Sequence, residues 1–371
     1  MEKSKNDFSS VNFYTNILVM PRSGVMEEAM ELKIKVDPND FEKQFTAVDS
    51  HTLGQFTRVV VSGFPKIEGN TMIEKKKFLE ENCQYIRTAL MHEPRGHADM
   101  FGSVLMESVN DEADFGVVYM DTGEYLNMCG HGTIGTATVC VEAGLVHMVE
   151  PYTDVILDAP AGIIRTRVKI DNKKATEVTI TNVPSFIYKE NNLLNIDGTD
   201  IKFDIVFAGN FFALVDATQL DFKIGAKNVS KFSTLGMKLL NKINKEVNVK
   251  HPILDITVVD HCEFYVTSDH EGADICNTVI FGDGQCDRSP CGTGTSSLLV
   301  KLHSLGKLSV GESIVTESVI GSHFTGTIKE ETVVGEFKAI VPQITGSAYI
   351  TGISTYLIDK NDPLKYGFLL G

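Results

Sequence analysis

The chain has 371 residues, which is long enough for two domains that each bury a core of their own. Hydrophobic residues make up 43% of it and charged residues 22%, as in water-soluble globular proteins, and no apolar run approaches the roughly 18 residues of a membrane span. The net charge of −15 repels nucleic acid and anionic membranes, so we expect neither as a partner. An anionic small-molecule substrate would also be repelled at long range, and backbone N–H groups would have to hold its carboxylate locally.

Cysteine usage and the N-terminal segment bear on location. Seven cysteines, an odd number, argue against a disulfide framework and predict a reducing, cytoplasmic environment. No Cys-x-x-Cys or His-x-x-x-His spacing points to zinc, and we expect no metal. Residues 1–44 are polar, do not resemble a signal peptide, and are predicted to form a poorly ordered extension.

The first elements of the fold are expected from about Phe45 onward. Val59–Val61 is predicted as the first strand, after a turn at Gly54. An amphipathic helix is predicted over residues 73–91, with its solvated face at Lys75–Lys77. Its buried stripe consists of Leu79, Cys83, Ile86 and Leu90, and Pro94 prevents its continuation.

Short strands are predicted next, at residues 104–106, 115–120 and 155–158. The residues of segment 134–141 are small and apolar on every side, which predicts a helix that is buried all round. The segment 297–305 is similar, except that Lys301 and His303 give it one polar flank. A surface helix is expected at 228–245. The break between the two halves is expected within 183–200, where Asn191-Asn192 and Asp197-Gly198 interrupt the pattern.

A repeat relates the two halves of the chain. Residues 128–133 read Met-Cys-Gly-His-Gly-Thr and residues 290–295 read Pro-Cys-Gly-Thr-Gly-Thr, so Cys129 and Cys291 correspond at an offset of 162. The same offset aligns 117–121 with 279–283 and Gly144 with Gly306. Each half therefore predicts a strand, a Cys-Gly-x-Gly-Thr turn and a buried helix that closes on glycine.

The position of each cysteine suggests its chemistry. A thiol at a helix N-terminus feels the positive end of the helix dipole, which is expected to lower its pKa from roughly 8.5 towards neutrality. Two thiols facing each other across a pseudo-twofold cleft could remove a proton from one face of a carbon and deliver one to the other. The alternative is that both are inert small residues at tight turns. The remaining cysteines have no partner in the repeat and are read as structural.

Other residues near the two turns carry functional groups. His131 and Asp287 could hold a substrate amine or orient the cysteines, or they could be an ordinary turn histidine and loop aspartate. The stretch 93–102, Glu-Pro-Arg-Gly-His-Ala-Asp-Met-Phe-Gly, is dense in functional residue types, but its spacing fits neither a metal site nor a nucleophile triad.

At these residues the chain resembles the proline racemase family, over about 45–371. The blocks 128–131 and 287–296 are similar to the two signature blocks of that family, and 51–54, 93–102 and 209–213 are further similar stretches. The resemblance implies an α/β (α+β) protein of the diaminopimelate epimerase type, with a buried helix wrapped by mixed strands in each of two pseudo-symmetric domains. It implies one domain of 45–185 with 343–371 returning to it, and a second of 186–342.

The resemblance also implies an activity and the residues that carry it. The activity is racemisation of proline by a homodimeric isomerase that needs neither pyridoxal phosphate nor another cofactor. Cys129 and Cys291 take the places of the two catalytic thiols, and His131 and Asp287 match positions that contact the imino nitrogen. The turn amides of Gly130, His131, Gly292 and Thr293 would hold the carboxylate, and Phe101 and Phe281 would enclose the ring.

The substrate and the activity each have an alternative. Aromatic walls suit the unsubstituted ring of proline and would leave a ring hydroxyl without a partner, so 4-hydroxyproline 2-epimerase is the second reading. Cys129 argues against the dehydratase members, which carry serine or threonine there. Two departures from the family pattern, Gln55 and Glu124, leave open an inactive binding or thiol-redox protein, and His323 is a third departure that bears on turnover.

Overall fold

The computed structural model describes residues 36–370, and the chain divides into the compact units Met1–Pro38 and Asn39–Gly371. The extension predicted over 1–44 therefore falls mainly outside the described residues. The described part of it forms a 3-10 turn at Pro38–Asp40 and enters the first strand at Lys43. Everything below concerns the second unit.

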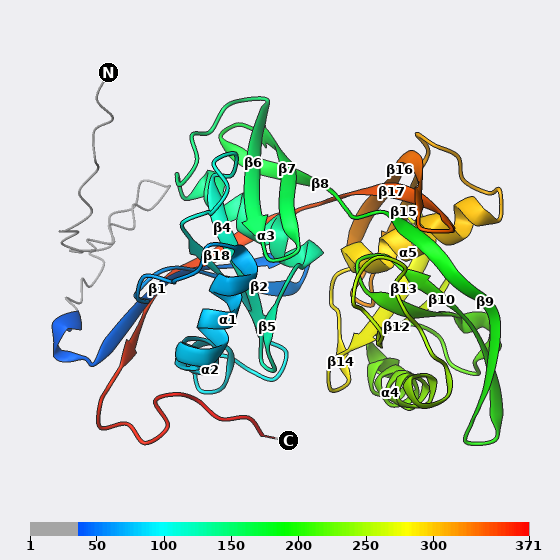
Figure 1. Cartoon of the computed structure of the whole chain (residues 1–371), viewed down its shortest axis with the longest axis horizontal. Helices are drawn as coiled ribbons and strands as arrows, with labels where there is room; N and C mark the ends of the chain where they lie inside the picture. The colour runs from blue at the N-terminus through cyan, green and yellow to red at the C-terminus, as the bar shows by residue number, and fades with distance from the viewer. Residues whose placement is uncertain (1–35, 371) are drawn as a thin grey trace, which may run out of the picture. The chain divides into compact units, whose positions relative to one another are not determined.

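One group of strands, which we call the first lobe, pairs in the order β18–β1–β2–β3–β4–β6–β7–β8, with β5 as a short hairpin partner of β4. Figure 1 shows the lobe in blue, cyan and green, with β18 returning in red. Its strands are β1 (Lys43–Thr52), β2 (Gln55–Ser62), β3 (Phe101–Met106), β4 (Phe115–Asp121), β5 (Tyr125–Leu126), β6 (Tyr152–Ala159), β7 (Gly162–Asp171), β8 (Lys174–Thr181) and β18 (Ala348–Ile358).

The second lobe is a ring of strands in the order β9–β10–β11–β12–β13–β15–β16–β17, which closes because β17 also pairs with β9. A short strand, β14, pairs with β13. The strands are β9 (Ser185–Ile196), β10 (Thr199–Phe207), β11 (Phe211–Asp216), β12 (Val259–Thr267), β13 (Ile275–Phe281), β14 (Gln285–Cys286), β15 (Ser313–Glu317), β16 (His323–Val334) and β17 (Phe337–Gly346).

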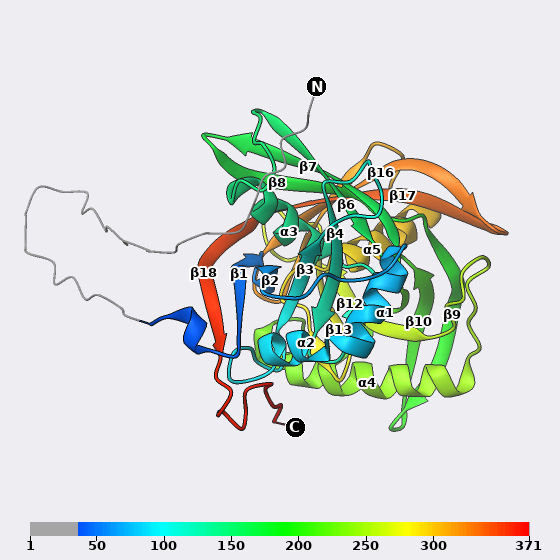
Figure 2. The same cartoon turned by 60° about the vertical axis from the view of Figure 1, so that its left-hand side comes forward.

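Each lobe wraps its strands around one helix, as predicted. In α3 (Gly130–Glu142) every residue through Val141 is buried, and in α5 (Gly292–Ser304) the polar flank at Lys301 is the less buried part. Glycine permits the close packing of α3, because a Cβ on Gly135 would lie 2.8 Å from Oγ1 of Thr57 on β2. The predicted surface helix is α4 (Val229–Glu246), which Figure 2 shows along the outside of β12 and β13.

Two segments carry the chain between the lobes. The first is the short link from β8 to β9, and the second is Ser347 between β17 and β18. The two crossings lie side by side, since β8 and β17 pair antiparallel with Thr181 opposite Gln343, and Oγ1 of Thr179 and Thr345 are 2.8 Å apart. Asn191 does not interrupt the second lobe. It lies within β9, where its backbone has a positive φ of 55°.

The repeat is present in the fold, but its strands follow a different register from its helices. The helix α3 begins at residue 130 and α5 begins at residue 292, an offset of 162. Both helices are followed by a glycine of positive φ, Gly144 and Gly306. The strand β4 begins at residue 115 and β13 begins at residue 275, an offset of 160. The alignment of 117–121 with 279–283 was therefore wrong by two residues. Because side chains alternate with a period of two, this shift keeps every residue on the expected face.

Three local predictions were also wrong. The helix expected over 73–91 is two helices, α1 (Met72–Asn82) and α2 (Gln84–Met91), because the backbone leaves the helical region at Cys83, with φ −132° and ψ 25°. Lys75 is buried rather than solvated, and its Nζ donates to the carbonyl oxygen of Glu107 at 2.6 Å. The strand that contains Val59 is the second, not the first, because β1 precedes it.

Candidate active site

The two Cys-Gly turns meet where α3 and α5 begin. A Cβ on Gly130 would lie 3.5 Å from Cα of Gly292, and one on Gly292 would lie 3.6 Å from Cα of Gly130, so the turns face each other directly. Cys129 and Cys291 are the N-cap residues, and their sulfurs accept N–H groups of Gly132 at 3.5 Å and Gly294 at 3.4 Å. The structure therefore brings together both thiols and the free N–H groups of two helix ends.

The two cysteines differ in backbone conformation. Cys129 is extended, with φ −155° and ψ 130°, whereas Cys291 has φ 61° and ψ 117°. A positive φ is unfavourable for a residue with a Cβ, and such strain is worth roughly 1–3 kcal/mol where the surroundings enforce it. Surrounding contacts must therefore hold the Cys291 turn in place.

Burial dominates the electrostatics of both thiols. It raises the pKa of Cys129 and of Cys291, and the nearby carboxylate of Asp287 raises both further. The N–H groups of Gly132 and Gly294 act in the opposite direction, as the helix-end argument requires. The expected shift towards neutrality was wrong for the free protein, because enclosure of the sulfurs outweighs the helix ends.

The residues that follow the cysteines contact the sulfurs in both copies. Nδ1 of His131 is 3.3 Å from Sγ of Cys129, and Oγ1 of Thr293, at the same position of the repeat, is 3.3 Å from Sγ of Cys291. Burial lowers the pKa of His131, so the imidazole is neutral near pH 7. Asp287 is also buried, and its Oδ1 accepts hydrogen bonds of 2.8 Å from N and Oγ of Ser289.

Aromatic side chains stand on both sides of the turns. The ring of Phe101 lies edge-on against His131, with centroids 4.4 Å apart, while Phe281 packs on the cluster of Ala208, Phe212, Val279 and Cys291. Sequence reasoning missed His261, whose ring stacks on that of Phe281 at 5.8 Å and 19°. At the strand offset of 160, His261 holds the position that Phe101 holds in the first lobe, so the register error concealed it.

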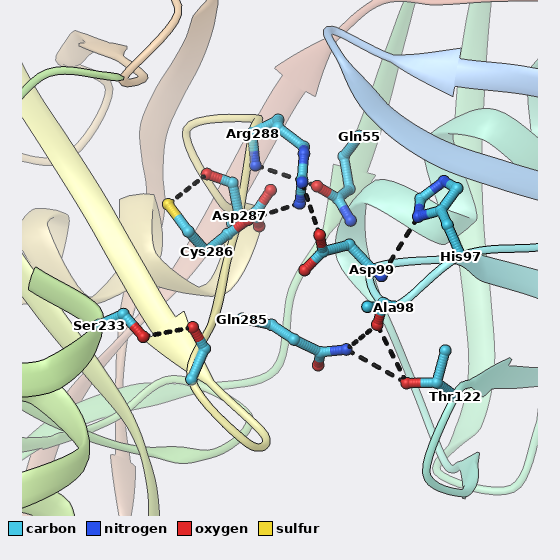
Figure 3. Close-up of polar contacts among 11 residues, drawn as sticks. Gln55, His97, Ala98, Asp99, Thr122, Ser233, Gln285, Cys286, Asp287 and Arg288 are labelled. Carbon is cyan, nitrogen blue, oxygen red and sulfur yellow. Dashed lines mark hydrogen bonds and ion pairs between the residues drawn. The ribbon is translucent and has the colours of Figure 1, made fainter. Parts of the chain in front are cut away.

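A set of polar contacts, which we call the clasp, fastens the loop before Cys291 to the first lobe (Figure 3). Asp99 forms an ion pair with Arg288 at 2.7 Å, and Oε1 of Gln55 accepts the backbone N–H of Arg288 at 3.0 Å. Nε2 of Gln285 donates to the carbonyl oxygen of Ala98 at 2.8 Å and to Oγ1 of Thr122 at 3.2 Å. The stretch 93–102 and the departure at Gln55 thus both belong to one inter-lobe contact.

The remaining sequence candidates lie elsewhere. Glu124 closes the tight turn after β4, where its N–H is donated to Oδ1 of Asp121 at 2.8 Å, and His323 is an exposed residue that opens β16. All seven cysteines lie among the described residues, and each is a free thiol. Burial raises the pKa of Cys286 to about 11, and its Sγ contacts Oγ1 of Thr278 at 3.3 Å, as suits a structural residue.

Comparisons with known proteins agree with this architecture. The family model for proline racemase matches residues 47–369. Proline racemases of Acetoanaerobium sticklandii and Clostridioides difficile are each 53% identical to the chain, over 88% and 89% of it and 99% of their own lengths. Two solved structures superpose with a TM-score of 0.81. The first is a probable proline racemase from Agrobacterium radiobacter, 34% identical over 88% of this chain and 96% of its own. The second is a hydroxyproline epimerase from Agrobacterium vitis with bound trans-4-hydroxy-L-proline, 31% identical over 89% of this chain and 96% of its own.

The chain therefore belongs to the proline racemase family, and it is an isomerase of the racemase and epimerase class with the mixed α/β fold of that family. Over residues 36–370 we find no helix long and apolar enough to cross a membrane.

Proposed function

We propose that the chain interconverts L- and D-proline by a two-base transfer of the α-proton between Cys129 and Cys291. The observation that carries the proposal is the direct apposition of the two Cys-Gly turns at Gly130 and Gly292. An inversion at carbon needs an acid and a base on opposite faces, and two opposed thiols provide both without a cofactor. The names of the relatives at 53% identity support proline as the substrate.

The reaction would begin with one cysteine as thiolate. Its sulfur takes the α-proton, so that the Cα–H bond breaks, an S–H bond forms, and the electron pair moves into the carboxylate. The opposite thiol then gives its proton to the other face of Cα and becomes the thiolate. The turn N–H groups of Gly130, His131, Gly292 and Thr293 would carry the negative charge that develops on the carboxylate oxygens.

Substrate binding offers a way to form the thiolate in a site whose burial opposes it. The carboxylate of Asp287 is one cause of the high pKa of both thiols. The secondary ammonium group of proline, placed against Asp287 and His131, would cancel that charge. One of the two thiols would then ionise only when the substrate is bound and water is excluded.

A second candidate is 4-hydroxyproline 2-epimerisation, and one observation favours it. His261 stacks on Phe281, and its Nε2 could pair with a hydroxyl group because Nδ1 is engaged by Asp260 at 2.8 Å, whereas Phe101 and Phe281 themselves favour an unsubstituted ring. The neighbour from Agrobacterium vitis contains trans-4-hydroxy-L-proline. The substitution His261→Leu should lower any activity on hydroxyproline and spare that on proline.

The test is α-deuteration in D₂O, followed by mass spectrometry and optical rotation, with L-proline and trans-4-hydroxy-L-proline as separate substrates. Exchange with loss of rotation for proline supports the proposal, and exchange with hydroxyproline alone transfers it to the second candidate. Cys129→Ser and Cys291→Ser should each abolish racemisation. Near-normal turnover in either folded variant would exclude the two-base mechanism.

A homodimer in the cytoplasm, which the resemblance and the cysteine content predict, forms part of the same proposal. Light scattering of the purified chain at micromolar concentration would give the oligomeric state. Fractionation of cells that express it would give the location.

A further inference from the structure

Glu263 lies on β12 beneath the Cys291 turn, and its side chain is fully buried. One carboxyl oxygen, Oε1, accepts a hydrogen bond of 2.7 Å from Nδ2 of Asn277 on β13. The other, Oε2, is hydrogen-bonded to Oγ of Ser297 in α5. The side chain therefore joins two of the elements that surround Cys291, and the mechanism proposed above makes no use of it.

Ser297 offers its single proton to two acceptors, Oε2 of Glu263 and a backbone carbonyl oxygen. The hydroxyl group of Ser297 has one proton, and it lies 2.8 Å from the carbonyl oxygen of Gly294, which can only accept. If the proton goes there, the contact between Ser297 and Oε2 needs a proton from the carboxyl group itself. Burial raises the pKa of Glu263 to about 7, against the lowering effect of its two partners. Burial thus favours a neutral carboxylic acid near or below that pH, and its hydrogen bonds to Asn277 and Ser297 hold the carboxyl group in place.

Asn277 extends the link from Glu263 to the reactive cysteine. The Nδ2 group that donates to Glu263 also donates to the carbonyl oxygen of Pro290 at 2.8 Å. With both of its hydrogens engaged, the amide is fixed, and so is the peptide plane that leads into the strained Cys291. The carboxyl group also supports the turn from below, since a Cβ on Gly294 would lie 2.9 Å from Oε1 of Glu263.

We propose that Glu263 is a positioning residue for Cys291: its buried carboxyl group, acting through Asn277 and Ser297, holds the turn that presents the thiol. The inference deepens the proposed function and rests on it for the catalytic role of Cys291. The first lobe is built differently. At the strand offset of 160, the residue that corresponds to Glu263 is Ser103, whose Oγ lies 2.9 Å from Oγ1 of Thr136. Only the thiol of the second lobe therefore has a buried acid beneath it.

The asymmetry predicts a pH effect confined to Cys291. Burial and Asp287 are the larger causes of its raised pKa, and a negative charge on Glu263 would raise it further. Ionisation of Glu263 and formation of the Cys291 thiolate therefore oppose each other. The other titratable groups around Glu263 are His261, Cys262 and Tyr265 on its own strand, and Cys291 at the start of α5, which Asp287 also faces.

Variants that separate hydrogen bonding from charge test the positioning role. In Glu263→Gln the amide can donate to Ser297 and accept from Asn277, so this conservative variant should keep most of kcat. Glu263→Leu loses both bonds, and kcat should fall roughly 10²-fold, as expected for a reacting group displaced by about 1 Å. Asn277→Ala should lower kcat by a comparable factor, and the double variant with Glu263→Leu should show little further loss.

A matched control removes another buried acid of the same lobe. Glu317 is 3% exposed and bonds Ser268 at 2.8 Å and His270 at 2.6 Å, without contact to the Cys291 turn. Glu317→Leu should therefore leave kcat within about 3-fold of the parent, by the same reasoning on distance. Far-UV circular dichroism and the melting temperature confirm that each variant is folded.

Site-specific alkylation provides a readout that needs no turnover. Iodoacetamide labelling of Cys291 and Cys129, resolved by mass spectrometry of peptides, is followed against pH in the parent and in Glu263→Gln. The curve for Cys291 should move to lower pH, while that for Cys129 stays in place. An unmoved Cys291 curve, or full kcat in folded Glu263→Leu, overturns the proposal. If racemisation itself is absent, the proposed function fails, but the shift at Cys291 still reports on Glu263.

Discussion

We predict that opening of the clasp admits substrate to the partly buried Cys129 and the buried Cys291, and the variant Asp99→Asn tests this. The substitution removes the charge from the ion pair with Arg288 and leaves the shape of the side chain unchanged. Both side chains of this pair are about one third exposed, at 29% and 33%, so water screens their attraction. Partly exposed pairs of this kind contribute roughly 0.2–1 kcal/mol.

That free energy sets the size of the expected effect. Since about 1.4 kcal/mol corresponds to a factor of ten, the loss should lower the ratio of closed to open protein by roughly 1.4- to 5-fold. KM should change little, because the substitution weakens closure to a similar extent with and without substrate. The effect on kcat should also be small, because Gln55 and Gln285 still hold the loop once it has closed.

The assay combines kinetics with thiol accessibility. Alkylation of Cys129 and Cys291 without substrate should accelerate roughly 1.4- to 5-fold, and high salt should reduce the difference between variant and parent. Glu112→Gln is the matched control, because it breaks an ion pair of equal length, 2.7 Å, with Arg165 on the exposed surface. Unchanged alkylation in Asp99→Asn would refute the reasoning that the clasp governs access.

Two glycine substitutions and one histidine substitution give further predictions. In Gly132→Ala the new Cβ would lie 2.7 Å from Cε1 of Phe101, so the ring must move and KM for proline should rise. In Gly346→Ala the new Cβ would lie 2.3 Å from Cε1 of Phe324 in the core, so the free energy of unfolding should fall by about 1–3 kcal/mol while KM stays unchanged. Equal KM values in these two variants would contradict a pocket role for Phe101. Burial lowers the pKa of His251, so the unfolded chain binds more protons and the free energy of unfolding should fall as pH drops through about 6.5. In His251→Asn the amide oxygen can still accept the N–H of Leu254. Urea titrations of this variant should show a smaller fall in the free energy of unfolding between pH 7 and pH 5. An identical pH dependence would assign the effect to other groups.

The features that the sequence predicted correctly depend on local patterns. A thiol before a glycine-rich turn and a small apolar run predicts an N-cap and a buried helix, and both copies have them at Cys129 and Cys291. The closing glycines, Gly144 and Gly306, follow from the left-handed backbone that ends many helices. These signals need only a few neighbouring residues, so they survive without knowledge of the fold.

The errors arose where distant segments compete with local preference. The break at Cys83 faces β5, because its carbonyl oxygen accepts the hydroxyl proton of Tyr125 at 3.0 Å. The register of the repeat was ambiguous because a two-residue shift leaves the alternation of β13 unchanged. For the thiols, a helix end argued for a low pKa, and burial that only the closed site creates reversed it.

The sequence by itself determined that two cysteines would begin two buried helices, because N-caps, glycine turns and apolar runs act over a few residues. Only the tertiary structure decided what surrounds them. It placed the turns against each other at Gly130 and Gly292, fastened them through Asp99 and Arg288, and buried Glu263 beneath one of them. In a strand, Glu263 looks like any exposed glutamate, and its role depends on contacts with residues 14 and 34 positions away, which no local pattern encodes.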